Sequence, residues 1–277
     1  MGNENCLKTN SMKSEILQLL KSSPDVISGE ELSQQLRVSR VTVWKHIKAL
    51  QELGYDIVSG PKGYSYREGH DFLHPWEFEE RQEKIHFFQS LPSTMGKAKE
   101  MAREGAPDQT VIIADAQLEG RGRMQRTWFS ESGGLYFTLI LRPQIPASSA
   151  FLMNFITSTV LVETVRSQTG LDARVKWPND ILLGEKKLSG MLSEMEATED
   201  LVAFVNIGIG LNVNNDPSSD EARATSLAIE LGRPVRRREL LTEFLQRLEL
   251  SLADLRLEAA VQEWKKYTMT LGRQVKI

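Results

Sequence analysis

With 277 residues, of which 40% are hydrophobic and 26% charged, the chain can form one large or two smaller soluble domains, and its formal net charge of −3 excludes a protein that is basic as a whole. The single cysteine, Cys6, excludes a disulfide framework and a cysteine-based zinc site, and it suits a reducing compartment. We find no signal peptide and expect no window apolar enough to span a bilayer, so the expected location is the cytoplasm, without a membrane partner.

The first eleven residues, 1–11, are expected to be disordered, and 12–68 have the pattern of a winged helix-turn-helix domain. Apolar residues at helical spacing are followed by Ser-Ser-Pro, which predicts a first helix that stops there. Ser28 and Ser39 are predicted N-caps of a second and a third helix. Gly54 ends the third helix, and two short strands around a Gly-Pro-Lys-Gly turn follow.

The third predicted helix combines an apolar face with a cluster of basic residues. Val43, Ile47, Leu50 and Leu53 are expected to line its buried face. Small units of this kind also bind proteins, but the basic residues concentrate on the helix that enters the major groove in such domains, which favours DNA. A single winged domain binds weakly, so dimerisation is expected. The predicted DNA-binding residues are Ser39, Arg40, Thr42, Lys45, His46, Lys48 and Lys62.

Residues 69–83 are predicted to be a linker, and 84–270 a second domain. Strand patterns in this domain follow one another directly, with few alternating crossovers, and a long helix at 148–170 is apolar on most sides. Two amphipathic helices are expected at 238–255 and 258–269. The succession predicts an α+β domain with a mixed or antiparallel sheet that carries helices.

The segment "EGRGRMQRTWFS", Glu119 to Ser130, lies between two apolar strands and is therefore a loop at a sheet end. Gly120 and Gly122 permit close approach of a ligand, and their amides can point at anions. Arg121 and Arg123 offer planar donors for carboxylate or phosphate. The alternative is a solvated basic loop.

Two further segments carry polar groups near predicted strands. In "KWPNDILL", Pro178 precedes Asn179 and Asp180, whose amide and carboxylate suit a ribose, a cation or an amine, although both residue types also favour turns. In "EKKLSGMLSE", Lys186 and Lys187 point to opposite faces of a strand, and the spacing leaves open which of them faces the interior.

In "GIGLNVN", Gly208, Gly210 and Asn212 share one face of a strand. The two glycines leave a slot for a ligand or a helix. The segment lacks the third glycine and the strand-turn-helix context of a dinucleotide fingerprint.

In chain order, "PST", "Q..GRGR....WFS", "KWPND", "KLSG" and "GIGLNV", behind a winged helix-turn-helix, resemble the bifunctional biotin protein ligase and biotin operon repressor family, the biotin–[acetyl-CoA-carboxylase] ligases. The resemblance extends from Met12 onward. It implies a class II synthetase-like catalytic domain that uses biotin, ATP and Mg²⁺, without a fixed metal site, and a biotin carboxyl carrier protein as acceptor. It also implies operator DNA as a partner, and a C-terminal SH3-like domain of which 271–277 would be the first strand.

The resemblance assigns roles to individual positions, and it selects Lys187 over Lys186. The implied catalytic residues are Arg123, Lys187 and Asp180. The implied biotin-binding residues are Ser93, Thr94, Met95, Gln117, Gly120, Arg121, Gly122, Arg123, Lys187 and Gly190. The implied ATP- and adenylate-binding residues are Arg121, Arg123, Trp128, Asn179, Lys187 and Asn212. "MQR" stands where many members have more Gly and Arg.

These roles imply that the chain activates biotin to biotinyl-5'-AMP, transfers it to a lysine, and represses transcription in response to biotin. We also expect the adenylate to order the glycine-arginine loop and to promote a homodimer. Two alternatives remain at this point: a non-enzymatic winged-helix repressor that senses a small molecule, and a ligase for lipoate or octanoate.

Overall fold

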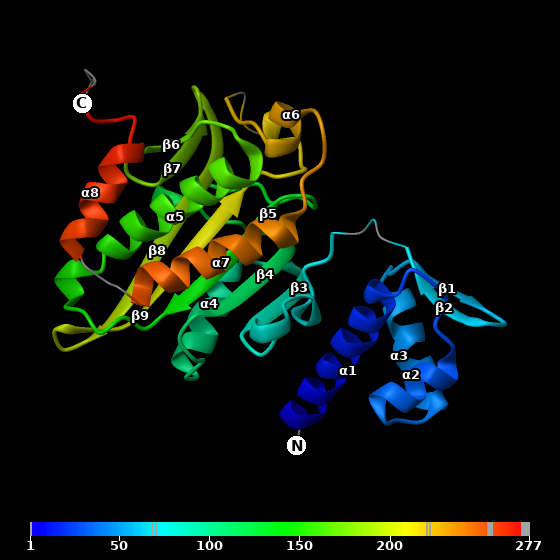
Figure 1. Cartoon of the computed structure of the whole chain (residues 1–277). Helices are drawn as coiled ribbons and strands as arrows, with labels where there is room; N and C mark the ends of the chain where they lie inside the picture. The colour runs from blue at the N-terminus through cyan, green and yellow to red at the C-terminus, as the bar shows by residue number, and fades with distance from the viewer. Residues whose placement is uncertain are drawn as a thin grey trace. The chain divides into compact units, whose positions relative to one another are not determined.

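The structure, a computed structural model, describes residues 2–67, 69, 71–219, 221, 223–253 and 257–272. The chain divides into two compact units, Met1–Glu83 and Lys84–Ile277, and each unit is considered by itself (Figure 1).

The first unit is a winged helix-turn-helix, as predicted. Its helices are α1 (Gly2–Ser22), α2 (Gly29–Leu36) and α3 (Arg40–Glu52), and its wing is the antiparallel pair β1 (Ile57–Gly60) and β2 (Gly63–Tyr66). The Ser28 hydroxyl accepts a hydrogen bond from the amide of Glu31 at 3.0 Å, and the Ser39 hydroxyl accepts one from the amide of Thr42 at 3.1 Å. Both predicted N-caps are therefore confirmed.

Two details of this unit differ from the sequence-based expectation. Helix α1 includes residues 2–11, which we expected to be disordered, because no proline or glycine interrupts the chain between residues 3 and 22. Leu53 is 38% exposed and lies at the C-cap of α3, so the buried face of that helix consists of Val43, Ile47 and Leu50.

The segment predicted as a linker packs against the first unit. Trp76, in the short 3-10 helix Pro75–Glu77, joins its apolar core. The Trp76 indole donates to the Tyr55 hydroxyl at 2.9 Å, and that hydroxyl donates to Glu77 at 2.7 Å. Lys21 donates to the other oxygen of Glu77 at 2.8 Å. The segment after the wing therefore belongs to the winged unit by its contacts.

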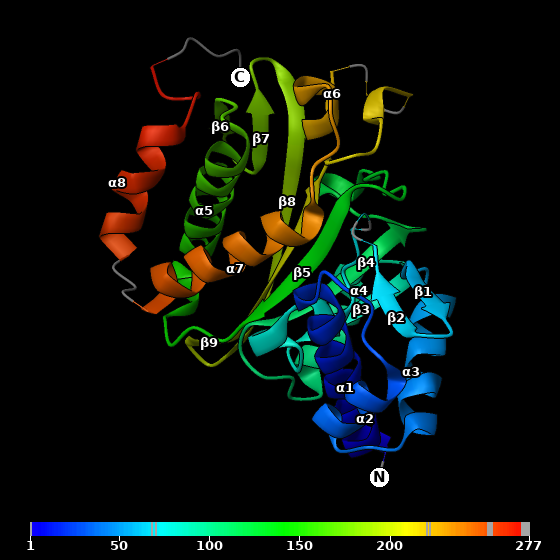
Figure 2. The same cartoon turned by 45° about the vertical axis from the view of Figure 1, so that its right-hand side comes forward.

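The second unit is built on a seven-stranded sheet of order β3-β4-β5-β9-β8-β7-β6 (Figure 2). Strands β3 and β4 are parallel, and the other neighbours are antiparallel, which confirms the mixed sheet. The strands are β3 (Ile85–Leu91), β4 (Thr110–Gln117), β5 (Leu135–Leu141), β6 (Ala173–Lys176), β7 (Asp180–Leu183), β8 (Lys186–Thr198) and β9 (Leu201–Leu211). The helices are α4 (Thr94–Arg103), α5 (Leu152–Thr169), α6 (Leu227–Leu231), α7 (Arg237–Ala253) and α8 (Leu257–Tyr267).

The alternation of side chains on β5 and β9 assigns the helices to opposite faces of this sheet. A Cβ at Gly208 would meet Met95 of α4, so the face that carries Thr138 and Gly208 is covered by α4. Phe137, the neighbour of Thr138, packs edge-on against Phe244 of α7 at 5.4 Å between ring centroids. Helix α5 packs against α7 and α8, and all three lie together in Figure 1.

Residues Ala147–Thr169 are long and apolar enough to cross a membrane by length and composition, with a mean hydropathy of 1.2, which corrects our expectation that no such window exists. In the structure 67% of this window is buried, as expected for a core helix that packs on neighbouring elements on most of its sides. For residues 173–196 the strand pattern predicts two strands around Gly184, whereas the structure has β6, β7 and the first part of β8 there. Most of the strand expected at 271–277 lies outside the described residues.

The ring of His74 stacks on Trp76 at 4.5 Å between centroids. Burial, and then the charge of Lys13, lower the pKa of His74 to about 4, while Glu77 opposes the shift. An unfolded histidine titrates near 6.5, so between pH 6.5 and 4 the unfolded chain binds more protons. The stability that depends on neutral His74 is therefore present above pH 6.5 and is lost as the pH falls towards 4.

We predict that the free energy of unfolding of the first unit falls between pH 7.5 and pH 5 in both proteins. The fall should be roughly 1–2 kcal/mol smaller in His74→Phe, which keeps the ring stacking, than in the wild type. Hydrogen exchange of the buried α3 amides at both pH values measures this difference in the full chain. Equal losses in the two proteins would contradict the assignment.

Candidate functional site

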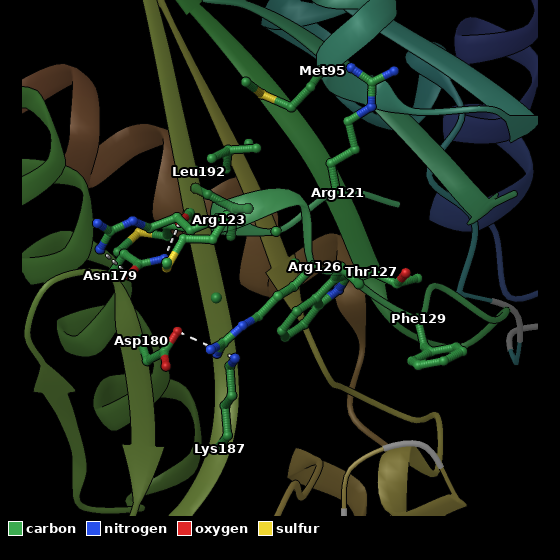
Figure 3. A pocket seen from close by; sticks show the side chains of 18 of the residues that line it. Met95, Arg121, Arg123, Arg126, Thr127, Phe129, Asn179, Asp180, Lys187 and Leu192 are labelled. Carbon is green, nitrogen blue, oxygen red and sulfur yellow. Dashed lines mark hydrogen bonds and ion pairs between the residues drawn. The ribbon is translucent and has the colours of Figure 1, made fainter. Parts of the chain in front are cut away.

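A cavity of about 470 Å³ lies in the second unit, between the N-terminus of α4, the loop between β4 and β5, and strands β7, β8 and β9 (Figure 3). Both glycine-rich segments found in the sequence contribute to its lining. The chain thus brings segments that are more than one hundred residues apart to one cavity, as loops and strand ends of a mixed sheet do.

The innermost polar groups form a chain of hydrogen bonds. The Gln117 side-chain oxygen accepts from the amide of Thr94 at 2.8 Å and from its hydroxyl at 3.0 Å, and the Gln117 amide group donates to Ser130 at 2.8 Å. Thr138 lies 2.8 Å from the Thr94 hydroxyl. Ser93 is only 5% exposed, and its hydroxyl has no partner in the described structure. A buried unpaired hydroxyl at a cavity wall is a place where a polar ligand recovers a lost hydrogen bond.

Ser93 stands at the N-cap of α4, yet its side chain makes no capping hydrogen bond. The neighbouring Thr94 hydroxyl donates to Gln117. The two hydroxyls at this helix start are therefore directed to the cavity wall and not to the helix end.

The glycine-arginine loop is an ordered hairpin. The amide of Trp128 donates to the carbonyl of Gly120 at 2.9 Å, and the amide of Gly122 donates to the carbonyl of Arg126 at 2.7 Å. A Cβ at Gly120 would lie 2.1 Å from the Trp128 carbonyl oxygen, so this glycine permits the close approach of the two arms of the hairpin. Figure 3 shows Arg121 on the Met95 side of the cavity and Arg123 on the Asn179 side.

The indole of Trp128 fills the Gly210 part of the slot predicted on β9 and also lies against Gly190 of β8, whereas Met95 fills the part at Gly208. A Cβ at Gly210 would lie 2.2 Å from the indole nitrogen, and one at Gly190 would lie 3.0 Å from the ring. The indole N–H is buried and has no hydrogen-bond partner in the described structure. The slot predicted on the strand face therefore holds one side chain of the loop and one of α4.

Cationic groups line the other end of the cavity. The Lys187 ammonium lies 3.5 Å from Asp180 and 3.9 Å from Glu221, and 5.1 Å from the centre of the Trp128 ring. Arg123 donates to the side-chain oxygen of Asn179 at 3.2 Å (Figure 3). This end can receive an anionic group of a ligand, because its arginine is bonded here to a neutral amide.

The two adjacent lysines face opposite ways, as strand alternation requires. Lys187 lines the cavity, whereas Lys186 pairs with Glu230 at 3.0 Å and is 57% exposed. The spacing left this choice open, and the structure places Lys187 at the cavity.

Most of the site residues predicted from the sequence line the cavity, and two do not. Asn212 is buried and accepts a hydrogen bond from Asn215 at 3.1 Å, and neither Asn212 nor Gly120 lines the cavity. Sequence reasoning missed Thr138, although a threonine in the apolar strand "LYFTLIL" is the signal that could have identified it. The predicted residues that line the cavity are Ser93, Thr94, Met95, Gln117, Arg121, Gly122, Arg123, Trp128, Asn179, Asp180, Lys187 and Gly190.

In the first unit, the residues predicted to contact DNA have different surroundings. Lys45, Lys48 and Lys62 are exposed. Arg40 is exposed and lies 3.7 Å from Glu30. His46 is partly buried, and burial followed by the charge of Lys13 lowers its pKa, so it adds no positive charge near neutral pH.

The Ser39 hydroxyl lies 2.9 Å from that of Thr42, and it also caps α3, so both side chains take part in the helix cap.

Residues 87–212 match the model of the "Biotin/lipoate A/B protein ligase family", and residues 13–65 match that of an "HTH domain". The chain is 33% identical over 281 residues to the "Bifunctional ligase/repressor BirA" of Bacillus subtilis strain 168, with 96% of this chain and 86% of the relative covered. It is 30% identical over 211 residues to the protein of that name from Escherichia coli K12, with 75% and 65% covered.

Among solved structures, the chain is similar to the biotin protein ligase from Aquifex aeolicus in complex with biotin and ATP. The TM-score is 0.58 at 28% identity, with 68% of this chain and 79% of that chain covered. The Bacillus relative matches both units and nearly the whole chain, so this chain belongs to the family of bifunctional biotin protein ligases and repressors.

Proposed function

We propose that the chain is an ATP-dependent biotin–[acetyl-CoA-carboxylase] ligase that also represses transcription. It activates biotin to biotinyl-5'-AMP, transfers the biotinyl group to a lysine of a biotin carboxyl carrier protein in the cytoplasm, and binds operator DNA through its first unit. The observation that carries the catalytic part is the cavity, which has the unpaired Ser93 hydroxyl and a chain of neutral hydrogen-bonding groups at one end and cations at the other. Biotin has the matching polarity, with a ureido ring at one end and a carboxylate at the other.

In the proposed orientation the ureido ring meets Ser93 and the Thr94–Gln117 pair, which supply an unpaired hydroxyl and a fixed amide. The apolar middle of biotin lies against the indole of Trp128 and Met95, both of which line the cavity. The carboxylate then points to Arg123 and Lys187. Fixed donors of this kind orient a ligand without rearranging on binding.

In the first step a carboxylate oxygen of biotin attacks the α-phosphorus of ATP, the bond to the bridging oxygen breaks, and pyrophosphate leaves. Both reactants are anions, so Arg123 and Lys187 act by reducing their repulsion and by stabilising charge in the transition state. Lys187 leaves its contacts with Asp180 and Glu221 when it receives the phosphate. No protein nucleophile takes part in this step.

A Mg²⁺ ion bound to the triphosphate would neutralise phosphate oxygens at this site. Among the described residues, no group of three or more His, Cys, Asp or Glu side chains could hold a metal ion. Asp180 and Glu221 line the cavity and fit a cation that arrives with its own phosphate ligands.

In the second step the neutral amine of the acceptor lysine attacks the acyl carbon, the bond to the AMP oxygen breaks, and AMP leaves. The attacking nitrogen loses a proton, and Asp180 is the proposed acceptor or orienting group at this end of the cavity. The hairpin loop excludes water from the reactive anhydride until the acceptor arrives.

The matched family model also includes lipoate ligases, so lipoate is the alternative substrate. Incubation of the chain with ATP, acceptor protein and either biotin or lipoate, followed by mass spectrometry of the acceptor, distinguishes the two. The biotinyl adduct is the expected product. No adduct with either acid would leave a non-enzymatic repressor as the better description.

We predict that Lys187→Ala lowers kcat/KM for adenylate formation by roughly a hundredfold or more, because a cation that stabilises the transition state is lost. Lys186→Ala is the matched control, since this neighbouring lysine faces away from the cavity, and its activity should stay near that of the wild type. The measurement is biotin-dependent exchange of labelled pyrophosphate into ATP. Equal effects of the two substitutions would refute the assignment, and Arg123→Gly should behave like Lys187→Ala.

We predict that Gly210→Ala raises KM for biotin at least tenfold, because the new methyl group would expel the Trp128 indole from its slot. Gly96→Ala is the control, since a Cβ at Gly96 of α4 meets no heavy atom within 4 Å apart from its chain neighbours and the backbone of its own helix. Steady-state kinetics and a thermal unfolding curve for each variant separate loss of the slot from loss of the fold. Unchanged biotin kinetics in Gly210→Ala would contradict the role of the slot.

We also propose that the adenylate promotes a homodimer and thereby binding to DNA. The hairpin loop presents Met124 and Phe129, which are 84% and 53% exposed, and a ligand that fixes the loop fixes this apolar surface. Sedimentation velocity with biotin and ATP should show a larger species than without them, and Lys187→Ala should not respond. Identical sedimentation of the wild type in both conditions would reject the switch.

A further inference from the structure

The outer face of α3 carries two large apolar side chains. Val41 is 61% exposed and Trp44 is 50% exposed, although Val43, Ile47 and Leu50 on the opposite face of the same helix are buried. Val41, Trp44, Lys45 and Lys48 recur at helical spacing and therefore form one stripe. An exposed tryptophan costs solvation free energy, so a stripe of this kind indicates a surface that a partner covers.

The stripe borders a hollow of about 490 Å³ between the start of α3 and the wing. Arg40, Val41 and Trp44 line one side of it, and Pro61 and Lys62 of the turn between β1 and β2 line the other. The Lys48 ammonium lies 5.4 Å from the centre of the Trp44 ring. Apolar surface and positive charge are therefore interleaved on the same face.

Positive charge around the stripe favours nucleic acid over a protein as its occupant. Arg40, Lys45 and Lys48 lie on α3 with Val41 and Trp44, Lys62 lies across the hollow, and all four are exposed. Glu30, which also lines the hollow, lies 3.7 Å from Arg40, so the basic residues outnumber it. Lysine and arginine provide affinity through phosphates without reading sequence. Apolar side chains in the major groove have one apolar partner on the base edges, the 5-methyl group of thymine.

We propose that Val41 and Trp44 read thymine by contact with its 5-methyl group in the major groove, and so determine part of the sequence specificity of this chain. This inference rests on the proposed repressor function. Arg40, Lys45, Lys48 and Lys62 position the helix on the phosphates, whereas the two apolar side chains discriminate among bases.

The test uses the full chain with biotin and ATP, and as probe a duplex selected on it from a random-sequence library. A second duplex has the same sequence with deoxyuridine in place of thymidine, which removes only the 5-methyl groups. The wild type should bind the uracil duplex more weakly, by roughly three- to fourfold for each methyl group contacted. Fluorescence anisotropy at a fixed salt concentration measures both affinities.

Trp44→Ala and Val41→Ala should each reduce the ratio between the two affinities. Lys62→Ala is the matched control, because it should weaken binding to both duplexes equally and leave the ratio unchanged. Circular dichroism confirms that each variant is folded, and the smaller change at Val41 provides a second variant should Trp44→Ala unfold the unit.

Equal binding of the two duplexes by the wild type would overturn the proposal. An unchanged thymine preference in folded Trp44→Ala and Val41→Ala, together with weaker self-association, would also overturn it and would identify the stripe as a protein interface. Failure to select any duplex would instead reject the proposed repressor function itself, so the two failures are distinguishable.

Discussion

The contact between the Trp128 indole and the backbone of Gly190 and Gly210 is the constraint on which the second unit's site depends. It joins the loop between β4 and β5 to strands β8 and β9, because the ring fits only where both strands lack a side chain. The same contact sets the direction in which the hairpin carries Arg121 and Arg123. A loop of glycines and arginines would otherwise sample many positions, and its charges would be solvated. The indole thus converts a flexible segment into one wall of a cavity.

The cavity separates two kinds of chemistry along its length. At the α4 end, neutral hydrogen-bonding groups are buried and held by one another, as in the chain from Thr138 to Ser130. At the β7 and β8 end, Lys187 pairs with carboxylates while Arg123 bonds to an amide. A ligand with one neutral polar end and one anionic end is therefore oriented by charge alone, before any shape selection operates. This polarity is the physical reason for a single productive direction of binding.

Sequence patterns predicted the fold class, and together with the family resemblance they predicted most of the residues that line the cavity, but they failed where tertiary contacts decide. Ser28 and Ser39 are capping residues whose signal is local, and both predictions are confirmed. Strand alternation required Lys186 and Lys187 to face opposite ways, yet only the packed sheet determines which side holds the cavity. Asn212 shares the strand face of Gly210 in the pattern, but β9 ends at Leu211, so the alternation no longer applies to it. The segment around Trp76 was predicted to be a linker, because local sequence patterns do not show contacts between distant residues. In the structure it contacts Tyr55 and Lys21, which are far from it in the sequence.

Groups that a folded chain normally pairs or covers are left unpaired at the cavity of the second unit and uncovered on the outer face of α3 in the first. A folded chain pairs its buried polar groups and covers its large apolar side chains, except where leaving them unpaired or exposed serves binding. In the second unit the Ser93 hydroxyl and the Trp128 N–H are buried without partners at the cavity. Side-chain polar atoms of Asn154, Asn206 and Trp264, which do not line the cavity, are also buried without partners, so the cations Lys187 and Arg123 are what set the cavity apart. The first unit leaves Val41 and Trp44 exposed on a helix whose opposite face is fully packed. At the cavity, a ligand with hydrogen-bonding groups recovers the free energy lost by the unpaired polar groups. On the outer face of α3, a partner with apolar groups amid negative charge recovers the free energy lost by the exposed apolar side chains. Unpaired polar groups and exposed apolar side chains require different partners, and that difference favours a small molecule for the second unit and a nucleic acid for the first.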